Sequence, residues 1–281
     1  MTSKVLLHIG TSSFSEPDWV GTFYPEGAKP AQFLELYAEK YRTVEIDATY
    51  YRIPAFKTVK GWHDRTPGNF VFSAKFPRSI VHGGTGAKPD RDVILLPEKT
   101  YEERNWFLQT MSHLKEKLGP LVIQFPYFSK DVFAKSDEFM ERLDVFLAAL
   151  PKEFKYAVEI RNKYWVTKGF RDMLANHGVA LTLVDQAWMP HGDELEPKMD
   201  IVTSDFCYIR LLGDRKKVES LTDRFDHEVI DQSERLNRWV ELIGRMIDRD
   251  IETYIYTNNH FSGYSPATAD KLIEVFASRE K

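Results

Sequence analysis

The sequence predicts an α/β fold, a TIM-like (β/α)8 barrel in which parallel strands alternate with outer helices. Eight short apolar runs recur along the 281 residues, separated by helix-length stretches. The links from helix to strand are short, whereas those from strand to helix are long. Most of the runs also end in a charged or amide residue, and in a closed barrel such strand ends meet at one face. A polar pocket is therefore expected at that face.

The apolar runs define the expected strands, which are residues 5–13, 43–47, 70–75, 121–125, 155–161, 179–185, 206–211 and 252–259. Apolar residues at helical spacing define the expected helices, which are residues 30–41, 56–65, 101–118, 135–150, 234–248 and 265–276. Pro266 directly after Ser265 is a typical first-turn and N-cap pair for the last helix. No linker or repeat interrupts this alternation, so we expect residues 1–281 to form one domain.

Loop lengths favour the barrel over a doubly wound open sheet, which is its main competitor. The long strand-to-helix links would all lie at one end of a barrel, and they are residues 12–29, 76–99, 186–205 and 212–233. An open sheet normally carries a G-x-G-x-x-G turn after its first strand. The corresponding sequence here, GTSSFSEPDW, lacks that pattern.

The composition is close to electrically balanced, with 38 Lys and Arg against 42 Asp and Glu and a net charge of −4. This balance argues against a surface that binds nucleic acid throughout, although it allows a local basic groove. Cys207 is the one cysteine and lies in an apolar run, so we expect it in the core and expect no intrachain disulfide. No signal peptide or membrane span is evident, and we expect a soluble cytoplasmic protein with no membrane partner.

Strand parity predicts which side chains face the barrel interior. Side chains alternate faces along a strand, so Glu45 and Asp47 share one face while Val44 and Ile46 share the other. The apolar parity suits packing against the outer helices, which leaves the polar parity for the interior. The same separation holds in four further runs, whose polar parity comprises Ser73 and Lys75, Glu159 and Arg161, Arg210, and Asn258.

The polar strand ends together form a mixed cluster of acids, bases and amides: Glu45, Asp47, Glu159, Asp185, Lys75, Arg161, Arg210, Gln124, Asn258 and Asn259. Paired carboxylates can serve as acid and base, and arginines can bind a carboxylate or phosphate. Lys75 could be an amine nucleophile if desolvated, or it could form an ion pair with Glu45 or Glu159. The alternative is a structural network that neutralises its own charges at the strand ends.

Metal and cofactor motifs are absent from the sequence. The eight histidines are scattered and form no H-x-x-x-H or H-E-x-x-H pair, so we expect no zinc cluster and name no metal ligand or cofactor. A carboxylate-bound Mg²⁺ or Mn²⁺ stays open. Aromatic residues such as Tyr50 and Trp165 near the same end either stack on a ligand or cap the core. The segment after Lys75 contains Arg78 and either meets an anion or is a plain loop.

Ordered motifs along nearly the whole chain resemble the YecE-like family, also called domain of unknown function 72. These motifs are Gly10-Thr11-Ser12, Trp19-x-Gly21-x-Phe23-Tyr24-Pro25, Thr43-Val44-Glu45-Ile46-Asp47-Ala48-Thr49-Tyr50-Tyr51, Lys75-x-Pro77-Arg78, Gln124-x-Pro126, Ala157-Val158-Glu159-x-Arg161, Tyr208-x-Arg210 and Asn258-Asn259. The resemblance implies a TIM-like barrel and a soluble protein, but it supplies no activity. The chain departs from the family at Phe14 and at Leu212, where many members have Trp and His, so a shared mechanism would rest on the carboxylates, Lys75 and the arginines.

Our leading hypothesis is an enzyme that binds a small anionic or polyhydroxylated ligand at the strand ends and performs metal-independent hydrolysis or isomerisation. Glu45, Glu159, Lys75 and Asp185 are the catalytic candidates. The ligand-binding candidates are Asp47, Tyr50, Arg78, Gln124, Arg161, Trp165, Arg210, Asn258 and Asn259. One alternative is a nucleic-acid-binding protein with a basic rim formed by Arg78, Lys88, Arg91, Arg215, Lys216 and Lys217. Another is a ligand-binding protein without turnover.

Overall fold

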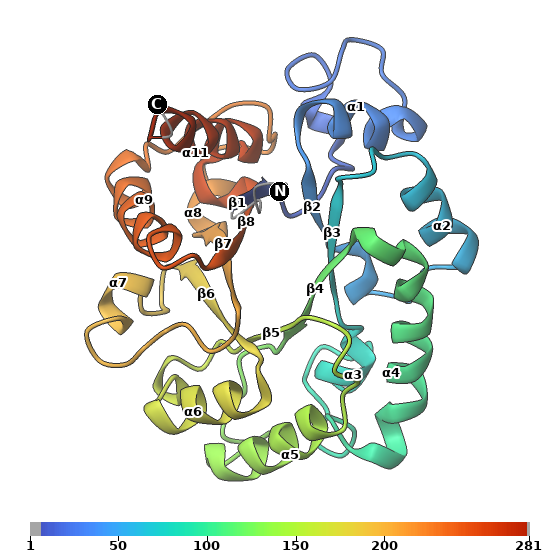
Figure 1. The fold of residues 1–281 in the computed structure, drawn as a ribbon, viewed down its shortest axis with the longest axis vertical. Helices are drawn as coiled ribbons and strands as arrows, with labels where there is room; N and C mark the ends of the chain where they lie inside the picture. Colours follow the sequence, from blue (N-terminus) through green and yellow to red (C-terminus); the bar gives the residue numbers. More distant parts are fainter. Residues whose placement is uncertain (1–6, 280–281) are drawn as a thin grey trace.

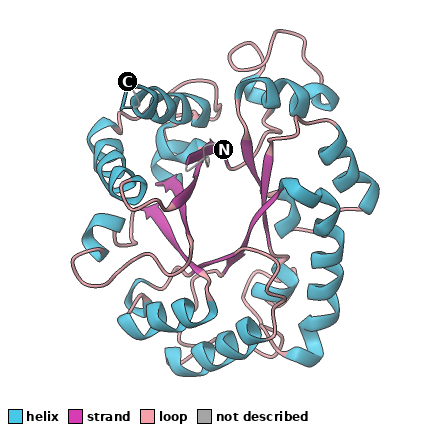
Figure 2. Cartoon of the chain, viewed as in Figure 1, coloured by secondary structure: helices cyan, strands magenta, loops and turns pink. Residues whose placement is uncertain are grey.

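The computed structural model describes residues 7–279, whose strands surround a central axis while helices cover the outside (Figures 1 and 2). Each expected apolar run coincides with one strand, and β4, β6 and β7 extend beyond their runs. The strands are β1 Leu7–Thr11, β2 Thr43–Ile46, β3 Val71–Lys75, β4 Leu118–Gln124, β5 Tyr156–Glu159, β6 Ala180–Gln186, β7 Phe206–Gly213 and β8 Glu252–Thr257. All hydrogen-bonded neighbours are parallel, in the order β1-β8-β7-β6-β5-β4-β3-β2. The barrel prediction is confirmed.

The long outer helices are α1 Phe33–Lys40, α2 Phe56–Asp64, α4 Pro97–Met111, α5 Ser136–Ala148, α6 Lys168–His177, α9 Ser233–Ile247 and α11 Ser265–Arg279. Shorter helices are α3 Arg78–Val81, α7 Gly192–Leu195, α8 Arg215–Glu219 and α10 Asn259–Ser262. Bounds were predicted for all of the long helices except α6. Thr167 caps the N-terminus of α6, and Gly178 ends it with a positive φ of 67°.

The expected helix 101–118 is displaced. Helix α4 begins at Pro97, whose fixed φ suits the first turn, and it ends at Met111. A 3-10 turn follows over Ser112–Lys117, in which Lys115 has a φ of 52°. Residues 118–120, which we expected to end the helix and link it to the strand, already belong to β4 because they extend the ladder beside β3.

The two end strands of the sheet, β1 and β2, meet through a tyrosine. Tyr37 of α1 is fully buried, and its hydroxyl accepts a hydrogen bond from the Thr11 backbone N–H at 2.9 Å. The same hydroxyl donates to the Thr43 carbonyl at 3.0 Å. A Cβ on Gly10 would lie 2.1 Å from that carbonyl oxygen, so β1 needs a glycine to approach β2 this closely. A side chain thereby bridges backbone groups at the seam of the barrel.

The interior of the barrel is narrow and closed by side chains. Its apolar layer is formed by Val122, Ala157, Ala180, Phe206, Tyr208, Tyr254 and Tyr256. The opposite parity packs in the larger core between strands and helices, where Cys207 is buried as expected. Inward-facing polar residues lie beyond this layer at both ends of the strands, with His8, Lys155 and Glu252 paired at the N-terminal end and Glu45, Glu159 and Arg210 at the C-terminal end.

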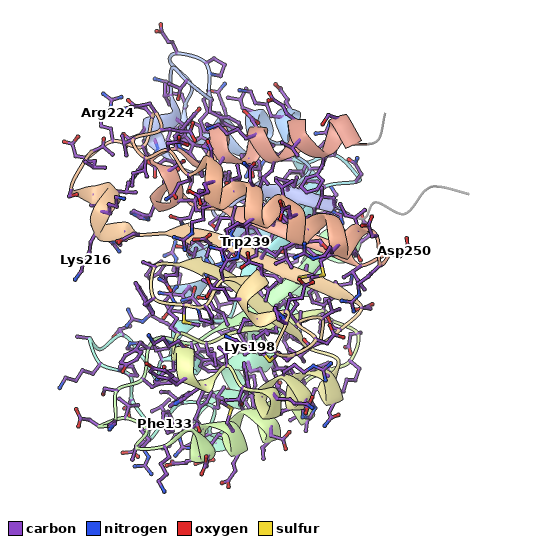
Figure 3. All side chains as sticks on the ribbon, turned by 90° about the vertical axis from the view of Figure 1, so that its left-hand side faces the viewer. Phe133, Lys198, Lys216, Arg224, Trp239 and Asp250 are labelled. Atoms are coloured by element: carbon purple, nitrogen blue, oxygen red, sulfur yellow. The ribbon has the colours of Figure 1, made fainter. Side chains whose placement is uncertain are left out.

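The elaborated loops lie at the C-terminal ends of the strands, and this face is called the mouth below. A side view shows Lys216, which follows β7, at one end of the molecule and Asp250, which precedes β8, at the other (Figure 3). No helix within residues 7–279 is both long and apolar enough to cross a membrane.

Candidate functional site

Arg210 of β7 organises the centre of the mouth. Its side chain is buried and donates to Glu45 Oε1 from Nη2 at 2.8 Å and from Nε at 3.2 Å. Nη1 donates to Glu159 Oε2 at 2.6 Å and to Gln124 Oε1 at 2.8 Å. The Tyr208 hydroxyl donates to the other oxygen of Glu45 at 2.8 Å. Side chains from β2, β4, β5 and β7 thus converge on one guanidinium, as strand parity predicted.

This arrangement places Glu45 and Glu159 out of reach of solvent. Both carboxylates are fully buried, and each is held by Arg210. Burial alone would raise the pKa of Glu159, but the charges of Arg210 and Arg161 outweigh it and lower that pKa below its usual range. Arg210 itself has a raised pKa because the two glutamates outweigh its desolvation. The network favours a charged glutamate as a fixed anion rather than as a proton donor.

Lys75, at the end of β3, forms its ion pair with Asp47 rather than with either glutamate. The reason is that Arg210 already occupies Glu45 and Glu159. Lys75 is nearly buried, whereas Asp47 is partly exposed at the mouth. Burial and the nearby Arg210 lower the pKa of Lys75. Although burial opposes ionisation of Asp47, the positive charges of Lys75, Arg210 and Arg161 lower its pKa.

Arg161 follows β5, and the Nη side of its guanidinium faces the mouth. Its Nε donates to Glu159 Oε1 at 3.0 Å, and a quarter of the side chain is exposed. Within residues 7–279, neither of its Nη atoms makes a hydrogen bond. Glu159 therefore fixes the orientation of Arg161 while leaving two nitrogen atoms available to an acceptor in the mouth.

Tyr50 and Arg78 lie at the rim beside this cluster. The Lys75 ammonium is 5.8 Å from the centre of the Tyr50 ring. Burial raises the pKa of Tyr50, partly offset by the positive charges of Arg78 and Arg161. Arg78 donates from Nη2 to the Gly86 carbonyl at 2.8 Å, and its buried Nε has no partner among the described residues. The loop 76–96 therefore brings a second guanidinium near Tyr50, where the charge of Arg161 also opposes the rise in pKa.

Asp185 is directed away from this group. It shares its face of β6 with Leu181 and Leu183, and its carboxylate meets helix α9 on the outside of the barrel. Oδ2 accepts from the Trp239 indole at 2.5 Å and from Arg235 Nε at 2.8 Å. The expectation that Asp185 joins the other acids at the mouth is not met. Parity along β6 was a signal that could have excluded it.

Asn258 and Asn259 have local structural contacts. Asn258 caps α10 by accepting from the His260 backbone N–H at 3.0 Å. Asn259 Oδ1 accepts from the backbone N–H and hydroxyl of Ser265 at 3.0 and 2.8 Å. Both residues nevertheless line a hollow of about 360 Å³ between the loops after β1, β2 and β8, together with Ser12, Glu16 and Asp47. We call this hollow the serine-rich pocket.

A second hollow, of about 290 Å³, lies between the loops after β4, β5 and β6 and includes Arg161 and Trp165. We call it the aromatic cleft. The strand order places these loops across the mouth from the serine-rich pocket. Sequence analysis did not identify Tyr127 and Tyr164, which also line the cleft. Tyr127 directly follows the motif Gln124-x-Pro126, and Tyr164 comes three residues after the motif Glu159-x-Arg161.

In the part of the chain that the structure describes, no group of three or more His, Cys, Asp or Glu side chains could hold a metal ion. The candidate site comprises a buried core of Glu45, Glu159 and Arg210, the nearly buried Lys75, and an accessible layer of Asp47 and Arg161.

Comparison with known proteins identifies relatives over nearly the full length of the chain. The sequence model of the family described as "Protein of unknown function DUF72" matches residues 8–281. The UPF0759 protein YecE of Escherichia coli O157:H7 is 30% identical over 226 residues, which cover 74% of each chain.

Solved structures agree with this match. A DUF72 family protein from Thermotoga maritima MSB8 superposes with a TM-score of 0.72 at 25% identity, covering 97% of this chain and 99% of the other. One from Enterococcus faecalis V583 has a TM-score of 0.67 at 21% identity, covering 96% and 94%. A D-tagatose 3-epimerase-like protein has a TM-score of 0.52 at 11% identity, covering 96% of both chains, and this likeness shows the fold alone.

Proposed function

Because the chain belongs to the DUF72 family, whose description names no activity, we propose its function from the geometry of the mouth. In this proposal the protein is an enzyme that transfers protons to or from a small anionic, polyhydroxylated substrate. The observation that carries the proposal is Arg161, which a buried carboxylate orients and which keeps two nitrogens free beside Lys75 and Asp47. A guanidinium held in this way binds a carboxylate or phosphate with defined geometry.

Arg161 and Arg78 bind the negative group of the substrate in this proposal. Lys75 carries the proton, since its lowered pKa makes it a better proton carrier near neutral pH than an unperturbed lysine. Asp47 remains ionised and orients the ammonium of Lys75. Glu45 and Glu159 are positioning residues, because they are buried against Arg210 and contact no space that a ligand could enter.

Substrate hydroxyl groups are assigned to the serine-rich pocket. Its lining combines hydroxyls with the carboxylates of Glu16 and Asp47, which accept hydrogen bonds from a polyol. The buried Ser12 hydroxyl has no partner among residues 7–279 and is available to such a ligand. Asp47 lines this pocket and also pairs with Lys75, so the proton-transfer pair stands at its edge.

A long nucleic-acid groove is less well supported. Of the rim cations that this alternative requires, Arg91 is bound to both oxygens of Glu138 at 3.0 and 2.6 Å. Arg215 is bound to Glu219 at 2.7 Å. Cations already neutralised by neighbouring carboxylates contribute less to phosphate binding and to its salt dependence.

Binding is tested by thermal shift, with and without EDTA, against sugar phosphates, nucleotides, small carboxylates and divalent metals. A ligand at a hundred times its dissociation constant stabilises the native state by about 2.7 kcal/mol. We expect an anionic compound to raise the melting temperature of the wild type but not of Arg161→Gln. Arg171→Gln is the matched control, since Arg171 is 24% exposed against 25% for Arg161 and lies on α6, paired with Asp172. Equal shifts in both variants would contradict the proposal.

Turnover is tested with the ligand so identified, followed by proton NMR in D₂O. Isomerisation through proton transfer at carbon introduces deuterium into the ligand, whereas hydrolysis produces a new compound. We expect Lys75→Met to bind the ligand but to catalyse neither deuterium incorporation nor hydrolysis. A wild-type protein that binds the ligand without altering it would instead be a non-catalytic binding protein.

A further inference from the structure

The aromatic cleft exposes large apolar side chains that packing does not require. Tyr127, Tyr164 and Trp188 are 61%, 83% and 48% exposed, and each comes from a different loop. Single exposed aromatic residues are common on protein surfaces, but three around one hollow are the usual mark of a binding site. These rings are positioned to stack on a planar group.

Hydrogen bonds and ring packing hold the floor of the cleft in place. Asn162 Oδ1 accepts from the Phe128 backbone N–H at 2.8 Å, and Asn162 Nδ2 donates to the Phe128 carbonyl at 2.9 Å. This pair joins the loop after β5 to the loop after β4. Trp165 packs on Phe139 of α5 with ring centres 5.3 Å apart. A ligand therefore meets a preformed surface and does not have to order these loops.

The polar lining of the cleft is cationic. Lys130, Arg161 and Lys163 line it, and no described lining residue is acidic. The Asn162 amide is engaged by the Phe128 backbone, so apart from the tyrosine hydroxyls the available polar side-chain groups are donors. An uncharged sugar would also need acceptors for its hydroxyls. The cleft instead suits a planar ring that bears acceptors and is joined to an anion.

We propose that the aromatic cleft binds the base of a nucleotide whose phosphate lies on Arg161. Arg161 lines the cleft and belongs to the accessible layer of the mouth, so one ligand can reach both. This inference rests on the proposed function and names its substrate class. The cleft volume of about 290 Å³ lies near the lower end of the ~300–1,000 Å³ typical of small-molecule sites, which fits a mononucleotide.

Calorimetric titration of the full chain tests the inference with the four nucleoside 5′-monophosphates, ribose 5-phosphate, and oligonucleotides of two to eight residues. We expect at least one monophosphate to bind at least about tenfold more tightly than ribose 5-phosphate. Stacking on an aromatic side chain contributes about five- to hundredfold in affinity per base. Trp188→Ala should weaken monophosphate binding by that factor and leave ribose 5-phosphate binding unchanged, whereas Arg161→Gln should weaken the binding of both compounds.

Trp106→Ala is the matched control, because Trp106 is 57% exposed and lies on α4, outside the cleft. Unchanged nucleotide affinity is expected in this variant. Ribose 5-phosphate binding as tightly as every nucleotide, with no effect of Trp188→Ala, would overturn the nucleotide inference and leave the proposed function standing. Affinity that rises steeply with oligonucleotide length would overturn it in favour of a strand-binding groove. If none of these compounds binds while another anion does so through Arg161, only the inference fails.

Discussion

Replacing Arg210 by methionine should strongly destabilise the fold, and more so at neutral than at acid pH. Arg210 donates four hydrogen bonds, to Glu45, Glu159 and Gln124. Its loss leaves two fully buried carboxylates without their principal partner. Breaking a buried ion pair in this way costs about 3–5 kcal/mol, against a total stability of about 5–15 kcal/mol for a folded domain.

The pH dependence follows from Glu159. In the wild type the pKa of Glu159 is lowered, so its contribution to stability is present above the unfolded pKa of about 4.3 and is lost as pH falls through the folded value. Without Arg210, burial becomes the dominant influence, and the pKa of Glu159 should rise above its unfolded value. The variant then regains stability as pH falls, so the difference in unfolding free energy should shrink between pH 7 and pH 5.

Urea unfolding followed by circular dichroism at pH 5, 6, 7 and 8 measures this difference. Arg245→Met is the control, because Arg245 pairs with Glu196 on the surface, where such a pair contributes about 0–1 kcal/mol. The reasoning is refuted if Arg210→Met loses no more than the control, or if its loss is the same at every pH.

Three further substitutions test the seam and the placement of Asp185 by the same unfolding assay. Tyr37→Phe should cost about 1–3 kcal/mol of stability, because backbone groups of β1 and β2 lose their hydrogen-bond partner. A loss no larger than that of Tyr24→Phe, which removes one hydrogen bond to a carbonyl, would contradict this. Gly10→Ala should destabilise the barrel, whereas Gly61→Ala in α2, where a Cβ meets nothing within 4 Å, should stabilise it by about 0.5–1 kcal/mol. Similar effects at both sites would refute the close approach of β1 to β2 at the seam. Asp185→Asn should lower the stability by about 1–3 kcal/mol, because its ion pair with Arg235 is lost, and should leave ligand affinity at the mouth unchanged. Reduced ligand affinity with unchanged stability would instead place Asp185 in the site.

Sequence periodicity was sufficient for the barrel and for the centre of the site. A short apolar run between turn residues is typical of a buried strand, and side chains two apart on a strand share a face. Applied to Glu45, Glu159 and Arg210, this rule placed all three in the interior, where they are found. Applied to Asp185, the same rule would have shown that it faces outward with Leu181 and Leu183.

Pairing between particular side chains did not follow from the sequence. Lys75 was expected to pair with Glu45 or Glu159, and it pairs with Asp47 instead because Arg210 occupies both glutamates. Arg210 can contact both glutamates because of the position of its guanidinium, and the closed barrel as a whole sets that position.

The sequence by itself determined the strands, which face of each strand packs against the helices, and the polar character of the mouth. These features depend on local periodicity and on the cost of burying charge. Only the tertiary structure decided how β1 meets β2 through Tyr37 and that Tyr127, Tyr164 and Trp188 line one cleft. The physical reason is that these contacts join residues from separate loops and helices. Their proximity is set by the closure of the barrel, and no local pattern in the chain encodes it.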